Sequence, residues 1–168
     1  MQRPKLIIGL GNPGEEYADT YHNVGYIFAD RFNKKRDEKG MINIRIAIRS
    51  DKNAMNNSGK FVVWAMQKYE ATKDEILIAH DDSDLELGTY KFSPDSGSAG
   101  HKGVQNIIDI LDTPSFWRLR IGIRPKPRTG SIRQKAETFV LKKISAANKK
   151  LILDACDKAI QEIFYLPL

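Results

Sequence analysis

The sequence predicts an α/β protein, folded as a single-domain three-layer α/β/α structure around a twisted mixed β-sheet. Three observations lead to this prediction. The 168 residues are enough for one compact core and too few for two comfortable domains. Short apolar or alternating segments, typical of strands, recur between segments with apolar residues at helical spacing. Turn residues separate the two kinds of segment, so we expect residues 1–168 to form one domain.

The first half of the chain is expected to alternate strand and helix. Residues 5–10 are an apolar run that ends in turn residues, as a buried central strand does. Residues 23–32 carry apolar side chains at helical spacing, and charged residues and a glycine close this helix. Isoleucine at every second position over 42–48 predicts a strand with one buried face. Ser58 is expected to cap the next helix, which extends to Tyr69.

The second half of the chain is expected to continue this alternation. Residues 75–80 are mainly apolar and indicate a buried strand, and residues 88–92 indicate another. A helix is expected over 104–111, where apolar side chains recur every three or four positions. Residues 117–124 alternate aromatic or aliphatic side chains with arginine or glycine, which predicts a strand. The last helix is expected from about 145 to 164, and this order of elements favours helices packed on a mixed sheet.

Charge and cysteine content bound the environment of the protein. The formal net charge of +6 favours a polyanionic partner, although an ordinary basic surface gives the same total. Cys156 is the only cysteine, so no intrachain disulfide can form, and its apolar neighbours indicate an inert core thiol. No apolar run approaches the length of a membrane span, and the first residues lack a signal-peptide cleavage pattern. We expect a cytoplasmic location.

Residues 9–14, Gly-Leu-Gly-Asn-Pro-Gly, match the G-x-G-x-x-G pattern of dinucleotide-binding turns. Such a site needs a helix that begins within the glycine run and an acidic residue at a strand end about 20 positions further on. Asp30 has this spacing but falls within the first expected helix. Glu15 and Glu16 would also repel a pyrophosphate at this position. We therefore expect a tight turn in this segment and no NAD site.

Five short motifs follow one another along the chain. They are LGNPGEEYADTYHNVG at 10–25, MNNSG at 55–59, HDDSDLELG at 80–88, GHKG at 100–103 and FWRLRIGI at 116–123. Each motif alone is weak, but their order and spacing over most of the chain argue against chance. In this arrangement the sequence resembles the bacterial-type peptidyl-tRNA hydrolase family.

This resemblance implies an esterase that acts on peptidyl-tRNA. Such an enzyme hydrolyses the ester between the terminal ribose of tRNA and a peptide or N-blocked aminoacyl group, and so recycles tRNA. The resemblance implies that water is the nucleophile and that no metal or other cofactor takes part. The implied partner is peptidyl-tRNA, bound through its acceptor end and 5′ phosphate, without a membrane or a protein partner. We expect the protein to be a monomer.

Three residues are expected to carry the chemistry: His22, Asp81 and Asn12. The neutral imidazole of His22 can take a proton from water near neutral pH. The Asp81 carboxylate can accept from the other ring nitrogen, fix the tautomer and stabilise the imidazolium that forms. The neutral amide of Asn12 can hold water or donate to a developing oxyanion. Taken singly, the histidine is more often a packing or surface residue and the aspartates 81, 82 and 84 an ordinary turn, so these roles depend on the resemblance.

The remaining expected site residues contact substrate or tRNA. The resemblance assigns substrate binding to six of them: Asn56, Met55, Tyr17, Asn23, His101 and Lys102. For His101 it implies a binding or orienting role, and Asn23 can equally well be the cap of the first helix. Lys102 stands where the family usually has asparagine, which puts substrate positioning there in doubt, and Tyr21 stands where the family usually has arginine.

Two further residues, Lys91 and Arg120, match family positions that grip the 5′ phosphate of tRNA. A second family lysine is replaced by Ser93. Arg118 and Arg120 share one side of the strand at 117–124, where both can meet phosphates or remain solvated on an exposed sheet face. The alternatives to hydrolysis are an RNA-binding relative without activity, resembling group II intron splicing factors, and a nucleotide-dependent enzyme.

Overall fold

The structure, a computed structural model, describes residues 1–40, 43–48, 57–125 and 135–167. Within these residues one sheet has the strand order β2-β1-β3-β5-β4. The strands are β1 (Leu6–Gly9), β2 (Arg45–Ile48), β3 (Ile76–Glu86), β4 (Tyr90–Ser93) and β5 (Trp117–Arg124). β1 is parallel to β2 and β3, and β3 is parallel to β5, whereas β4 is antiparallel to β5. The sheet is therefore mixed, as predicted.

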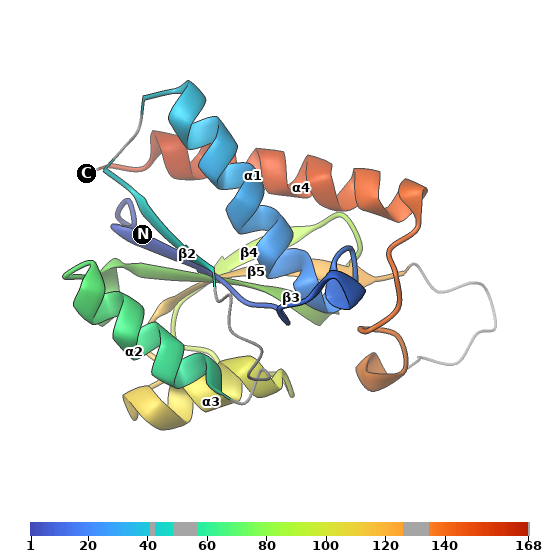
Figure 1. Ribbon diagram of the computed structural model, residues 1–168, viewed down its shortest axis with the longest axis horizontal. Helices are drawn as coiled ribbons and strands as arrows, with labels where there is room; N and C mark the ends of the chain where they lie inside the picture. Colours follow the sequence, from blue (N-terminus) through green and yellow to red (C-terminus); the bar gives the residue numbers. More distant parts are fainter. Residues whose placement is uncertain (41–42, 49–56, 126–134, 168) are drawn as a thin grey trace.

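Helices cover both faces of the sheet (Figure 1). Helices α1 (Val24–Glu38) and α4 (Ala146–Tyr165) lie on one face, and α2 (Ser58–Lys68) and α3 (Lys102–Leu111) lie on the other. The three-layer α/β/α prediction is confirmed. Among the described residues, no helix is both long and apolar enough to cross a membrane.

Two glycines determine how closely α1 approaches the sheet. A Cβ atom on Gly9 would lie 2.5 Å from the carbonyl oxygen of Gly25, and a Cβ on Gly25 would overlap the carbonyl oxygens of Leu10 and Ala79. Gly14 has a φ of +119°, a conformation that favours glycine. α1 begins only at Val24, well beyond Gly14. The glycines at 9 and 14 thus serve packing and a turn, which agrees with the prediction against a dinucleotide site.

The two faces of the sheet differ in their buried side chains. On the α1–α4 face, apolar residues come from β1, β3 and β5: Ile7, Leu77, Ala79, Leu119, Ile121 and Ile123. On the α2–α3 face, apolar strand residues come from β1, β2 and β3: Leu6, Ile8, Ala47, Ile76 and Ile78. By strand alternation, β5 presents Arg118 and Arg120 to this second face, and Lys91 of β4 pairs with Arg120 across the sheet.

Three local predictions differ from the structure. β3 continues through the aspartates to Glu86, where the sequence predicted its end at residue 80, because buried partners satisfy the carboxylates of Asp81 and Asp82. Asn57, and not Ser58, is the N-cap of α2, and Ser58 is its first helical residue. In β2, Ala47 is buried on the second face while the edge residue Ile48 is 38% exposed, so the predicted one-sided pattern is incomplete.

Cys156 lies within α4 and is fully buried. It packs in the apolar cluster between α1, α4 and the sheet. Burial raises the pKa of its thiol to about 12, so the thiol stays protonated and unreactive at neutral pH. The prediction of an inert core thiol is confirmed.

Candidate active site

A pocket of about 710 Å³ lies beside the polar half of β3. Its walls come from segments far apart in the sequence: Asn12 after β1, His22 before α1, residues 80–83 of β3, residues 98–102 at the start of α3, and parts of 135–141. In open α/β sheets, ligands bind where parallel strands and their following loops leave such a crevice. Three predicted site residues from separate motifs, His22, Asp81 and His101, meet in this pocket.

His22 is held by its backbone and by its side chain. It lies in a short 3-10 turn, Tyr21–Asn23, directly before α1. Its backbone N–H donates to the carbonyl of Val140 at 2.8 Å, and its Nδ1–H donates to Asp81 Oδ1 at 3.0 Å. Since a carboxylate oxygen only accepts, this bond places the imidazole proton on Nδ1 and leaves Nε2 as the basic nitrogen.

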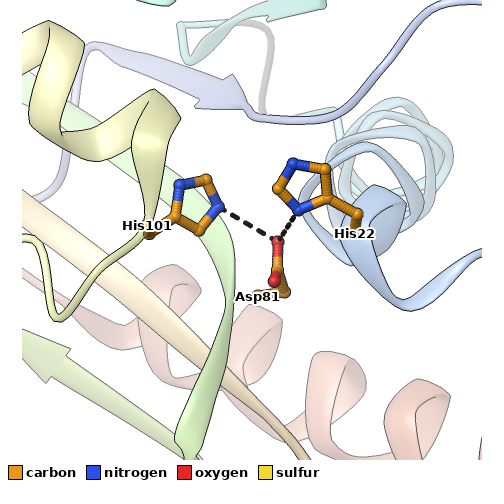
Figure 2. A group of neighbouring side chains, drawn as sticks. All are labelled: His22, Asp81 and His101. Atoms are coloured by element: carbon orange, nitrogen blue, oxygen red, sulfur yellow. Dashed lines mark hydrogen bonds and ion pairs between the residues drawn. The ribbon is translucent and has the colours of Figure 1, made fainter. Parts of the chain in front are cut away.

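Asp81 accepts from two histidines at one oxygen. Figure 2 shows His22 and His101 on opposite sides of the carboxylate, and the Nε2–H of His101 donates to Oδ1 at 3.1 Å. Burial opposes ionisation of Asp81, but the electrostatic interactions and hydrogen bonds with His101 and His22 outweigh it and hold its pKa well below the usual range. Burial also lowers the pKa of His22, yet the adjacent Asp81 raises it above its ordinary value overall.

His80, the remaining histidine of the sequence, also belongs to this group. Its Nδ1–H donates to the backbone carbonyl of Asp81 at 2.7 Å, and its ring packs edge-on against His101. Burial and the neighbouring His101 lower the pKa of His80 to about 3. His80 therefore stays neutral at physiological pH and serves as a buried packing partner of the cluster.

Asn12 is held in place by Asn23. The backbone N–H of Asn12 donates to Asn23 Oδ1 at 2.8 Å, and Asn23 Nδ2–H donates back to the Asn12 carbonyl at 2.9 Å. Asn23 occupies the N-cap position of α1 but makes no capping bond with its side chain, which is buried. This geometry decides against the capping role and leaves the Asn12 amide beside the pocket.

The other predicted substrate residues fall into three groups. Lys102 is exposed at the first residue of α3 and lines the pocket. Tyr17 is half-buried in the segment between β1 and α1. Like Asn23, it is not among the residues that line the described pocket. Met55 and Asn56 lie outside the described residues. Tyr21, in place of the family's arginine, is a buried core residue whose hydroxyl accepts from Asn148 Nδ2–H at 2.7 Å.

Lys91 and Arg120 lie together at the sheet edge. They are direct cross-strand partners of β4 and β5, so their side chains share the α2–α3 face. Arg120 Nε–H donates to the buried Asp82 at 2.6 Å, which uses one of the five N–H donors of the guanidinium. The structure thus brings the two predicted phosphate-binding residues side by side.

Arg118 does not share this exposed position. Its side chain is buried, packs over Phe116, and its guanidinium donates to the carbonyls of Ser96, Gly97 and Pro114. The expectation that Arg118 faces solvent or phosphate is therefore wrong. The alternation of β5 correctly predicts the sheet face on which Arg118 lies. The loop before α3, however, covers its side chain.

Several pocket residues were not expected from the sequence: Arg124, Lys135, Glu137, Val140 and Leu141. Val140 and Leu141 follow Phe139 in an apolar run that has the signature of a core segment. Leu141 is instead 55% exposed at the pocket. The only sequence signal for Arg124 is its position at the end of β5, next to the strand that carries Asp81.

His22, Asp81 and His101 also have the composition of a metal site, because one possible ligand atom from each lies within 4.8 Å of the others. In this arrangement the same three atoms are engaged in hydrogen bonds with one another. Both imidazole N–H groups are thus satisfied by the Asp81 carboxylate.

Comparisons with known proteins agree with this site. The sequence model of the family described as Peptidyl-tRNA hydrolase matches residues 6–166. The chain is 40% identical to a peptidyl-tRNA hydrolase of Erwinia tasmaniensis and 36% identical to one of Pseudothermotoga lettingae; the alignments cover 96% and 95% of this chain and 88% of each relative. A crystal structure of peptidyl-tRNA hydrolase from Acinetobacter baumannii has a TM-score of 0.82 with 33% identity, covering 99% of this chain and 89% of that one. The family predicted from the five motifs is confirmed: the chain belongs to the peptidyl-tRNA hydrolase family.

Proposed function

We propose that this protein hydrolyses the ester between the peptidyl, or N-blocked aminoacyl, group and the terminal ribose of tRNA. The oxygen of water bonds to the ester carbonyl carbon, and the bond from that carbon to the ribose oxygen then breaks. The products are a free carboxylate and a tRNA with its terminal hydroxyl restored. Family membership over nearly the whole chain supports this reaction.

The observation that carries the proposal is the His22–Asp81 pair at the pocket wall. With Nδ1–H committed to Asp81, Nε2 of His22 takes a proton from the attacking water and later returns one to the leaving ribose oxygen. A general base of this kind is typically worth about 10²- to 10⁴-fold in rate. The Asn12 amide, whose backbone Asn23 fixes, holds the water or stabilises the oxyanion.

The tRNA-binding part of the proposal rests on charge and position. Lys91 and Arg120 grip a phosphate of the tRNA acceptor end, on the part of the α2–α3 face where, among the described residues, neither β4 nor β5 contributes to the apolar cluster under the helices. Lys102 contributes a further cation at the pocket. We place this activity in the cytoplasm, in a monomer formed by residues 1–168 as one domain.

The RNA-binding relative without activity is disfavoured by the intact site. His22 Nδ1–H donates to Asp81, and Asn12 lines the same pocket, an arrangement that supports base catalysis. Loss of catalysis would release these positions from their chemical constraint, yet each keeps the residue that hydrolysis needs. Asp30, which the dinucleotide alternative would require at a strand end, lies within α1 and pairs with Lys34.

The test compares an N-acetylated aminoacyl-tRNA with the same aminoacyl-tRNA bearing a free amino group, each incubated with purified protein in EDTA. We expect cleavage of the blocked ester alone, because the chain belongs to a family of peptidyl-tRNA hydrolases. EDTA should leave the rate unchanged. Absence of cleavage by folded protein would favour the RNA-binding alternative, and inhibition by EDTA that a divalent ion reverses would contradict the histidine–water mechanism.

A further inference from the structure

His101 performs two tasks with one imidazole ring. It is the N-cap residue of α3, and its Nδ1 accepts a hydrogen bond from the backbone N–H of Val104 at 3.2 Å. A ring nitrogen that accepts carries no proton, so the proton of the neutral ring lies on Nε2. That Nε2–H donates to Asp81 Oδ1, the oxygen that also accepts from His22. The first turn of α3 therefore fixes the tautomer that Asp81 requires.

The backbone around His101 is fixed from the opposite side as well. The His101 N–H donates to the Ser98 carbonyl at 2.9 Å, and the buried guanidinium of Arg118 donates to the carbonyls of Ser96 and Gly97. These contacts hold the loop between β4 and α3 against β5. His101 consequently reaches Asp81 from a rigid position, with its side chain only 7% exposed.

We propose that His101 is a positioning residue for the hydrolysis: it caps α3 through Nδ1, so that its Nε2–H is directed to Asp81, and it holds the Asp81 carboxylate in the orientation that His22 needs. This inference rests on the proposed function and refines the expected binding or orienting role of His101. Because His101 and His22 both donate to Asp81 Oδ1, the bond from His101 weakens the interaction of that oxygen with His22. His101 thereby limits how strongly Asp81 favours the protonated form of His22 and keeps His22 usable as a base near neutral pH.

The variant His101→Asn separates the two tasks. Asparagine is a favoured N-cap residue, so the cap on α3 is retained, but an Asn side chain that caps is too short to reach Asp81. We expect kcat to fall about tenfold, the effect of losing one hydrogen bond to a charged group, while KM stays within about twofold of wild type. The acidic limb of the kcat/KM profile should move to higher pH, because Asp81 then acts on His22 alone.

Other charged groups around the pocket constrain this interpretation: Asp82 on β3, Lys102 on α3, Arg124 on β5, and Lys135 and Glu137 from the segment before α4. They are unchanged in the variant and act equally on both proteins. The matched control is Ser145→Ala, which removes the N-cap bond that Ser145 Oγ accepts from the Asn148 N–H of α4, away from the pocket. This control should lower the thermal midpoint and leave kcat and the pH profile unchanged.

Imidazole ¹⁵N NMR tests the inference without using activity, and the three histidines make assignment simple. We expect a proton on Nε2 of His101 and on Nδ1 of His22 and His80, and in His101→Asn the titration of His22 should shift to higher pH. A proton on Nδ1 of His101, an unmoved His22 titration, or a raised KM with unchanged kcat would each overturn the positioning role. If the NMR results hold but no blocked ester is cleaved, the proposed function fails while the coupling between α3 and Asp81 stands.

Discussion

The cluster around Asp81 and the basic pair Lys91–Arg120 contact β3 at adjacent residues, Asp81 and Asp82, yet they use charge in opposite ways. The Asp81 carboxylate accepts hydrogen bonds from two imidazoles of the cluster and is buried between them. One residue further on, Asp82 pairs with Arg120, whose neighbour Lys91 is exposed at the sheet edge. A closed network suits proton transfer, which depends on one defined tautomer, whereas phosphate binding needs charge that faces solvent.

Strand alternation makes this separation possible. Adjacent residues on β3 direct their side chains to opposite sides of the sheet, so one short motif supplies both regions. Changes in the Asp81 cluster should therefore alter kcat and its pH dependence. Changes in the Lys91–Arg120 pair should alter KM and its dependence on salt.

The largest effect is expected for His22→Ala. This change removes the proposed base, so kcat should fall by about 10²- to 10⁴-fold. Binding of tRNA should persist, because the basic pair is untouched. Single-turnover rates and filter binding on the same preparation give both values. A variant that keeps more than roughly a tenth of the wild-type kcat would remove His22 from the role of base.

A smaller loss is expected for Asp81→Asn. The imidazole of His22 remains, but its tautomer is no longer selected, so kcat should fall by roughly 10- to 10²-fold, less than after loss of the base itself. Without the carboxylate, burial alone acts on the pKa of His22 and lowers it. The acidic limb of kcat/KM should thus move to lower pH, opposite to its shift in His101→Asn. A shift to higher pH in Asp81→Asn would contradict the proposed geometry.

The pH dependence of stability isolates His80. Its pKa is about 3 in the folded protein, so below about pH 6.5 the unfolded chain takes up a proton that the folded chain refuses. Stability should fall by about 1.4 kcal/mol per pH unit between roughly pH 6 and 5. Below about pH 5 the carboxyls of Asp81, Asp157 and Glu75, whose pKa values are lowered in the folded protein, add slope of the same sign. His22 has a raised pKa, so its contribution is complete below pH 6.5 and adds no slope there.

The variant for this test is His80→Asn, whose amide can still donate to the Asp81 carbonyl and does not titrate. Urea unfolding at a series of pH values should show the slope in the wild type and its loss in the variant. An equal slope in both proteins would assign the acid sensitivity to other groups.

The smallest effects are expected at the sheet edge. Lys91→Ala should raise KM about two- to fivefold with kcat near wild type, since an exposed ion pair contributes little. The slope of log affinity against log salt should flatten by about 0.7 to 0.9. Lys34→Ala, at an exposed lysine of α1, is the matched control. An unchanged salt slope in Lys91→Ala would mean that Lys91 contacts no tRNA phosphate and is an ordinary solvated surface residue.

Arg120→Ala should have the same effect on KM and an additional cost in stability. It leaves Asp82 buried without its cation, which is expensive. The double variant Arg120→Ala, Asp82→Asn should recover stability and keep the raised KM. If kcat falls equally on tRNA and on a minimal ester without the tRNA body, Arg120 acts through folding or the active site.

Much of the fold and part of the site could be predicted from the sequence. Strand β5 and helix α4 follow directly from period and turn residues, because their side chains alternate in local patterns. The extension of β3 through Asp81 and Asp82 could not be predicted, since aspartates in succession indicate a turn unless distant partners neutralise them. His101 and Arg120, which are those partners, come from other elements.

The same limit applies to Asn23 and Arg118. Their side chains satisfy backbone groups of segments eleven and about twenty residues away, and no local pattern records such bonds. The family motifs predict a substrate-binding role for Asn23 and give no indication that its side chain supports the backbone of Asn12. Leu141 and Lys135 reach the pocket only because the segment before α4 packs against the His22 turn.

The position of β1 between β2 and β3 has a consequence for synthesis. Leu6 pairs with Arg45 on one side and with Ile76 on the other, so both neighbours of this strand are made long after it. At about 5–20 residues per second, the stretch up to Ile76 takes several seconds to emerge from a ribosome. During that time residues 6–8, which are buried in the finished sheet, are an apolar segment without strand partners. Other chains can pair with this segment. Slow translation of this stretch, or the lack of a chaperone while it emerges, would reduce the yield of active protein without any change in its sequence.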